Sequence, residues 1–125
     1  MSSESLHEAA EKLSPATIDR HRATVSLMEE LEAVDWYDQR IDAATDEELK
    51  AVLRHNRDEE KEHAAMVLEW LRRHDPVLDQ QLRTYLFKDG NIMAAEAEAE
   101  GAAEPADVGG GSLGIGDLRK DEVAP

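Results

Sequence analysis

A carboxylate and an imidazole interrupt the apolar stripe of one predicted helix. Glu60 and His63 lie three residues apart in the stretch RDEEKEHAAMVLEW, at positions where the helical pattern would place leucine. At this spacing the two side chains share one helix face and point the same way. Burying an unpaired carboxylate is costly, and a bound metal ion would compensate that cost. We therefore interpret Glu60 and His63 as candidate metal ligands.

Glu30 adds a carboxylate from a second predicted helix. It lies three residues after Leu27 and four before Val34, so it also falls on an apolar-lined stripe. In ferritin-like di-iron proteins, each half of the site takes a Glu from one helix and a Glu-x-x-His motif from another. One chain holds one such set, so two chains would complete the site. Oxygen-rich ligands with one imidazole per metal favour iron or manganese over copper.

Each of these residues also has a plainer interpretation. A Glu and a His at this spacing are most often solvent-side neighbours or a hydrogen-bonded pair. The acidic residues Glu29, Glu32, Asp35 and Asp38 fit a solvated face. Trp36 and Tyr37 fit packing at a helix interface. The remaining histidines have no partner motif, and no role is assigned to His7, His21, His55 and His74.

Two long helices must position the candidate ligands. Ser14 followed by Pro15 predicts the start of the first helix, with the serine as its N-cap. Thr45 with Glu48 three residues later forms a capping box, which predicts the start of the second helix. The connection between the helices is short, so we expect an antiparallel hairpin.

The second helix should end near His74, because Pro76 restricts the residue before it. A shorter third helix follows, and Gly90 can end it with a left-handed C-cap. The segment beyond is small, acidic and glycine-rich, which favours disorder. We therefore predict four regions: a flexible N-terminus over residues 1–13, a helical domain over 14–90, a disordered linker over 91–112 and a terminal region over 113–125.

The predicted fold class is all-α. An antiparallel two-helix hairpin with one short C-terminal helix cannot cover its own apolar stripe, because the faces opposite the seam stay in water. We expect dimerisation to complete a ferritin-like four-helix bundle, with a disordered C-terminal tail outside it.

The composition argues against several classes of function. The 125-residue chain has 29 acidic and 14 basic residues, and its formal net charge of −15 argues against nucleic acid and anionic membranes as partners. It has no cysteine, which excludes disulfides, thiolate zinc sites and thiol catalysis. The sequence shows no signal peptide and no apolar run long enough to span a membrane. We expect a soluble cytoplasmic protein.

The two long helices resemble those of the encapsulated ferritins. The strings VSLMEELEAVDWYDQR and HNRDEEKEHAAMVLEWLRR carry this resemblance, which covers most of residues 15–90. It implies antiparallel chains that meet at a di-iron ferroxidase centre, and an open ring of dimers in the form of a decamer. By this resemblance Glu30, Glu60 and His63 are the iron ligands, and Tyr37 lies beside the centre.

The same resemblance implies residues that attract metal toward the centre. Glu29 and Glu32 match metal-binding residues on the path to the site, and Trp36 lies near them. Iron is the implied metal. Calcium, manganese and zinc are other divalent cations that the two sites could take.

The C-terminus has a resemblance of its own. The string GGGSLGIGDLRK resembles the peptides by which cargo proteins dock inside encapsulin nanocompartments. In an extended chain Leu113 and Ile115 fall on one side, Leu118 adds a third apolar anchor, and Gly114 and Gly116 permit close approach to a groove. The alternative is a terminus without a role. We expect this peptide to bind the encapsulin shell protein.

The residues and the resemblance together predict a ferroxidase. It would oxidise Fe²⁺ to Fe³⁺ with dioxygen and feed iron mineralisation and storage inside an encapsulin nanocompartment in the cytoplasm. The alternative, from a different class, is a non-catalytic helical assembly protein in which Glu30, Glu60 and His63 bind a structural divalent metal ion.

Overall fold

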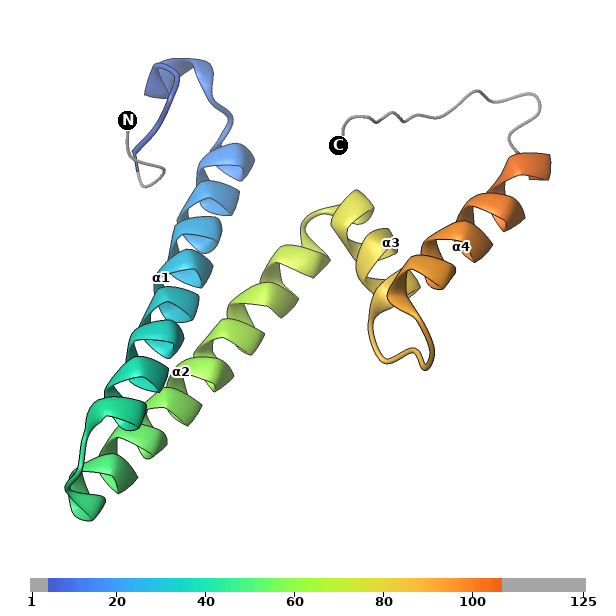
Figure 1. Cartoon of the computed structure of the whole chain (residues 1–125). Coiled ribbons are helices and arrows are strands. Elements are labelled where there is room, and N and C mark those ends of the chain that lie inside the picture. The colour runs from blue at the N-terminus through green and yellow to red at the C-terminus, as the bar shows by residue number, and fades with distance from the viewer. Residues whose placement is uncertain (1–4, 107–125) are drawn as a thin grey trace. The chain divides into compact units, whose positions relative to one another are not determined.

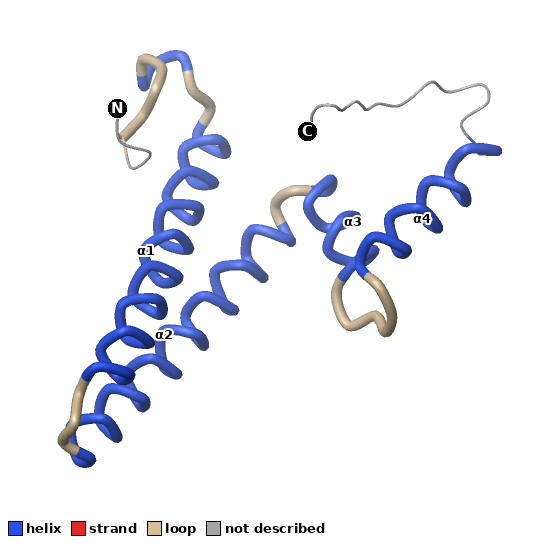
Figure 2. Tube along the Cα trace, in the orientation of Figure 1, coloured by secondary structure: helices blue, strands red, loops and turns tan. Residues whose placement is uncertain are grey.

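The computed structural model describes residues 5–106, and its regular structure is helical throughout that range (Figure 1, Figure 2). A short 3-10 helix, η1 (Ala10–Lys12), precedes the helices α1 (Pro15–Ala43), α2 (Glu47–Arg73), α3 (Pro76–Tyr85) and α4 (Ile92–Ala106). The predicted all-α class is confirmed. The chain divides into two units between residues 79 and 80.

The start of α1 follows the sequence signal. The hydroxyl oxygen of Ser14 accepts a hydrogen bond from the backbone N–H of Thr17 at 3.1 Å, and Pro15 occupies the first helical position. The serine thus satisfies a backbone donor that has no partner within the helix, and the proline lacks the donor that would otherwise stay unpaired. The predicted N-cap is confirmed.

The start of α2 differs from the predicted capping box. The N-cap is Asp46, whose carboxylate accepts a hydrogen bond from the N–H of Leu49 at 2.8 Å. Thr45, the expected cap, therefore lies one residue too early. A carboxylate at this position binds the free N–H groups and also interacts favourably with the positive end of the helix dipole, so aspartate has the advantage over threonine. The helix ends at Arg73 with His74 as C-cap, as expected.

The helices α1 and α2 form an antiparallel hairpin joined by a short loop (Figure 1). Few side chains are buried in the hairpin: among the described residues they are Ile41 on α1 and Ala64 and Leu71 on α2. Large apolar side chains stay in water elsewhere on the hairpin, with Leu31 54 % and Met66 58 % exposed. A hairpin with so small a core needs a further surface to cover its apolar groups.

Ion pairs tie the end of α2 to the start of α3. The Arg72 guanidinium pairs with Glu69, one turn earlier, at 2.8 Å and also with Asp79 at the start of α3. Asp75 precedes α3, and its carboxylate accepts a hydrogen bond from the N–H of Leu78 at 3.0 Å. These contacts connect the end of α2 with the first turn of α3, which begins at Pro76.

The end of α3 differs from the prediction. The helix stops at Tyr85, and Phe87 has a φ of 60°, the left-handed conformation that the sequence pattern assigned to Gly90. Gly90 also has a positive φ of 90°, but it lies in the loop that follows. Because left-handed residues are usually glycine or asparagine, a phenylalanine gives no signal of a helix end.

The predicted disordered linker over 91–112 differs from the structure, which has α4 over most of it. The side-chain oxygen of Asn91 accepts hydrogen bonds from the N–H groups of Met93 at 2.8 Å and Ala94 at 3.2 Å, and so caps the helix. Alanine, glutamate and methionine then continue it, since all three have high helix propensity. Residues 107–112 and the terminal region over 113–125 lie outside the described residues, as do residues 1–4 of the predicted flexible N-terminus.

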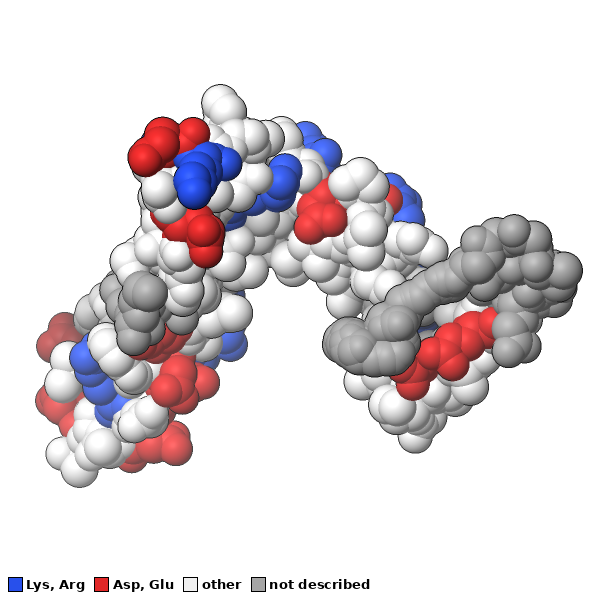
Figure 3. All heavy atoms as spheres, turned by 90° about the horizontal axis from the view of Figure 1, so that it is seen from above, with Lys and Arg blue, Asp and Glu red and all other residues white. Residues whose placement is uncertain are grey.

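The described surface carries both signs of charge. Acidic and basic side chains are interspersed on the face that Figure 3 shows. Among the described helices, none combines the length and the apolar character that a membrane crossing requires.

Candidate metal centre

Three predicted ligands converge on one side of the hairpin. Glu30 comes from α1, and Glu60 and His63 come from α2. One ligand atom from each residue lies within 4.8 Å of the others, and within residues 5–106 no second group of this kind occurs. All three side chains are half-buried, with the two carboxylates only 24 % and 25 % exposed. The α1–α2 hairpin alone thus assembles the set that the sequence predicted.

The contacts within this cluster follow from helix geometry. The imidazole Nδ1 of His63 lies 3.0 Å from Oε1 of Glu60, one turn earlier on α2, and 3.7 Å from Oε2 of Glu30 on α1. The three-residue spacing on α2 brings the first pair together. The antiparallel pairing of α1 with α2 brings in the third group.

Two members of the cluster have shifted pKa values. Partial burial raises the pKa of Glu30, and its hydrogen bond with Glu60 and the charge of that carboxylate raise it further. The hydrogen bond to Glu60 raises the pKa of His63, with the Glu30 carboxylate adding to the effect. Glu30 and His63 therefore retain their protons more readily than isolated side chains do. A divalent cation that binds here must displace those protons.

The donor set fits iron. Two carboxylates and one imidazole form an oxygen-rich site without sulfur, which suits Fe²⁺, Fe³⁺ or Mn²⁺. One chain supplies three protein ligands, so an ion bound to it keeps open coordination positions. Those positions would remain free for further ligands.

The other predicted site residues lie on α1 outside this cluster. Glu29 and Glu32 are exposed, and Trp36 is 49 % exposed. Tyr37 is half-buried, and the Arg40 guanidinium carbon lies 5.5 Å from the centre of its ring. These positions place all four residues within two turns of Glu30 on the same helix. Their roles stay predictions.

A cross-helix ion pair next to the cluster was not predicted. Nη1 of Arg57 on α2 donates to Oδ1 of Asp38 on α1 at 3.0 Å, and Nε donates to Oδ1 of Asp58 at 3.1 Å. Arg57 lies three residues before Glu60. The only sequence signal was this spacing, because the pairing with Asp38 depends on the register of the two helices.

Two of the histidines without an assigned role, His55 and His74, make contacts outside the cluster. His55 makes a long contact of 3.9 Å with Glu59. His74 stacks on Trp70 with 3.8 Å between the ring centroids, and its Nδ1 lies 2.8 Å from the Trp70 carbonyl oxygen. The second arrangement caps the C-terminus of α2.

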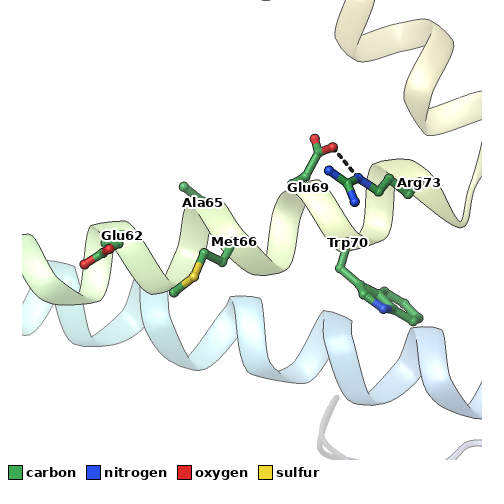
Figure 4. A pocket seen from close by; sticks show the side chains of 6 residues that line it. All are labelled: Glu62, Ala65, Met66, Glu69, Trp70 and Arg73. Carbon is green, nitrogen blue, oxygen red and sulfur yellow. Dashed lines mark hydrogen bonds and ion pairs between the residues drawn. The ribbon is translucent and has the colours of Figure 1, made fainter.

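An open hollow of about 430 Å³ lies on α2, away from the metal cluster. Figure 4 shows Met66 and Trp70 on one side of the helix and Glu69, paired with Arg73, on another. The lining residues are Glu62, Ala65, Met66, Glu69, Trp70 and Arg73. The hollow is an apolar surface with a charged rim, and it contains none of the candidate ligands.

Two known proteins are similar to this chain in sequence. An encapsulated ferritin-like protein from Rhodospirillum rubrum is 62 % identical over 94 % of this chain and 90 % of its own length. An encapsulin nanocompartment cargo protein, EncC, from Myxococcus xanthus is 38 % identical over 73 % of this chain and 77 % of its own.

A solved structure and a family model agree with these relatives. The crystal structure of protein ne0167 from Nitrosomonas europaea matches with a TM-score of 0.68 and 60 % identity, over 70 % of this chain and 96 % of that one. The model of the EncFtn-like family matches residues 5–89, a range that contains the whole α1–α2 hairpin and α3. The chain that carries this Glu, Glu and His cluster therefore belongs to the EncFtn-like family.

Proposed function

We propose that this protein is a ferroxidase, which oxidises Fe²⁺ to Fe³⁺ with dioxygen at a di-iron site shared between two copies of the chain. The observation that carries the proposal is the convergence of Glu30, Glu60 and His63, with ligand atoms within 4.8 Å of one another. The membership of an encapsulated ferritin-like family supports iron as the metal.

The number of ligands in one chain and its exposed apolar surface both support a site that two copies share. Three ligands from one chain leave an ion with open positions, and a two-fold axis would add the same three from a partner. The exposed apolar side chains of the hairpin supply a reason to associate, since Leu31, Leu49 and Val52 are each about half exposed. Two hairpins would then form a four-helix bundle. The full assembly would be a ring of such dimers, the decamer that the resemblance to the encapsulated ferritins implies.

The chemistry proposed for each residue follows from its type. The Glu30 and Glu60 carboxylates bind Fe²⁺ and stabilise the higher charge of Fe³⁺ even more. Neutral His63 provides one imidazole per metal, which requires loss of the proton that Glu60 helps it to hold. Each Fe²⁺ gives one electron to dioxygen. Tyr37 would lie beside this centre.

Glu29 and Glu32 are proposed to attract cations toward the centre from the exposed face of α1, with Trp36 beside them. Both glutamates are exposed and precede the half-buried Tyr37 on the same helix. Other divalent cations, such as calcium, manganese or zinc, would also bind such carboxylates.

The proposed place of action is the inside of an encapsulin nanocompartment in the cytoplasm. Relatives are named as an encapsulated ferritin-like protein and an encapsulin nanocompartment cargo protein. The terminal region over 113–125 would bind the shell protein through Leu113, Gly114, Ile115, Gly116 and Leu118. Fe³⁺ released from the oxidase would then be mineralised and stored in the shell.

An oxygen pulse tests the proposal. The full chain is loaded with Fe²⁺ without oxygen, then mixed with oxygenated buffer while ferric absorbance is followed. We expect a rapid rise for the wild type, loss of most of it in Glu60→Gln, and a wild-type rise in Glu62→Gln. The control removes the same charge from an exposed position on the same helix.

The same experiment distinguishes a ferroxidase from the alternative, a protein with a structural divalent metal site. If the wild type binds Fe²⁺ but shows no faster absorbance rise than Fe²⁺ in buffer alone, the protein is not a ferroxidase. Equal initial rates in the wild type and Glu60→Gln would place the oxidation elsewhere in the molecule.

A further inference from the structure

Arg57 is a cation on α2, three residues before the candidate ligand Glu60. Its side chain is 23 % exposed and held at two atoms, by Asp38 across the hairpin at 3.0 Å and by the adjacent Asp58 at 3.1 Å. Hydrogen bonds to Asp38 and then Asp58 raise the pKa of Arg57, so the group stays charged. The cross-helix contact fixes the direction in which the guanidinium points.

This direction matters because Glu60 lies within reach of Arg57. On an α-helix, residues three apart are neighbours on one face, and an arginine and a glutamate at that spacing form an ion pair readily. In the structure Arg57 pairs instead with Asp38 and Asp58, while Glu60 faces His63 and Glu30. The two aspartates thus hold the cation away from a carboxylate that is a candidate metal ligand.

We infer that Asp38 is a positioning residue for the metal centre, which holds Arg57 across the hairpin and so keeps Glu60 available to a cation. The inference rests on the proposed metal site and adds a residue that acts through another. Asp38 lies on α1 and pairs with Arg57, so its effect on metal reaches the cluster through that guanidinium.

Loss of Asp38 should lower the metal affinity for two reasons. Without Asp38, Arg57 can turn toward Glu60 and compete with the metal for the carboxylate. A guanidinium nearer to the cluster also repels a divalent cation. Together these effects weaken metal binding by about fivefold at a partly exposed site.

Calorimetric titration of the full chain with Mn²⁺ tests the inference, at one fixed protein concentration. We expect Asp38→Asn to bind Mn²⁺ about fivefold more weakly than the wild type. Arg57→Gln should bind at least as tightly as the wild type, because it removes the competing cation. The double variant, Asp38→Asn with Arg57→Gln, should bind like Arg57→Gln alone.

The matched control is Asp35→Asn. Asp35 lies one turn before Asp38 on α1 and accepts a hydrogen bond from Gln39 at 3.1 Å. The control removes the same charge without breaking the contact to Arg57, so it should lower the affinity less than about twofold.

The affinities of the variants distinguish a role of Asp38 in positioning Arg57 from a role in stabilising the hairpin. If Asp38 only fastened the hairpin, then Asp38→Asn, Arg57→Gln and the double variant would all bind Mn²⁺ more weakly, and that result would overturn the inference. Wild-type affinity in Asp38→Asn would overturn it as well. The proposed metal site fails separately, if wild-type protein and Glu60→Gln bind Mn²⁺ equally well.

Discussion

Glu30 and His63 come from different helices, yet Oε2 of the glutamate lies 3.7 Å from Nδ1 of the histidine. This contact depends on the register of α1 against α2 and not on any local motif. It converts a common Glu-x-x-His pair on one helix into a group of three ligand atoms within 4.8 Å. The hairpin alone therefore brings all three candidate ligands together.

Metal affinity should rise with pH. Glu30 and His63 both have raised pKa values, above 4.5 and 6.5, so each holds a proton to higher pH than usual. Those protons compete with the metal, and affinity falls as pH drops through the raised pKa of His63. Below that pKa the loss approaches about tenfold per pH unit for each proton displaced. Mn²⁺ titrations over a series of pH values measure the slope, which His63→Ala should reduce.

Metal and association should be thermodynamically linked. If the ion binds to ligands from two chains, it stabilises the pair by about 2.7 kcal/mol at a hundredfold excess over Kd. We expect chelator-treated protein to shift toward smaller species at low concentration, and added Mn²⁺ to restore the larger assembly. Glu30→Ala should weaken this dependence. Native mass spectrometry measures the distribution of oligomer sizes. A distribution that does not change with metal would mean that the site lies within one chain.

Asp46, and not Thr45, should carry the stability of the α2 N-terminus. Asp46→Ala removes the acceptor for the Leu49 N–H and should lower the free energy of unfolding by about 1 kcal/mol. Thr45→Ala should change it by less than about 0.5 kcal/mol. Urea unfolding of the two variants, at one protein concentration with chelator present, measures this difference. Equal losses of unfolding free energy would show that Thr45 contributes to the cap as much as Asp46 does.

The terminal peptide should be separable from the metal chemistry. Truncation before Leu113 removes the predicted apolar anchors and leaves the hairpin with its cluster intact. We expect unchanged Mn²⁺ affinity and no copurification with coexpressed encapsulin. Fusion of residues 113–125 to an unrelated protein should transfer the copurification. Capture of the truncated chain by the shell would show that another surface mediates docking.

Helical periodicity and spacing predicted part of the geometry of the candidate cluster. Glu60 and His63 both lie on α2, so their spacing alone predicts the contact between them. The Ser14 N-cap of α1 likewise depends only on local sequence. The contact between Asp38 and Arg57 crosses two helices, and its register cannot be read from either one.

The errors at the ends of elements have local causes. Thr45 and Asp46 are adjacent residues that can both cap a helix, and the sequence pattern chose the one with a glutamate three residues later. The small, acidic and glycine-rich composition of residues 91–112 indicated disorder. The structure instead has a helix over Ile92–Ala106, in agreement with the high helix propensity of alanine and glutamate.

Anomalous diffraction at the iron edge, from crystals of the full chain grown or soaked with Fe²⁺ in the absence of oxygen, tests the central claim most directly. The shared ferroxidase site predicts iron peaks on or beside a two-fold axis between two chains, each in contact with Glu30, Glu60 and His63. Iron bound to a single chain, or peaks elsewhere with this cluster empty, would contradict it.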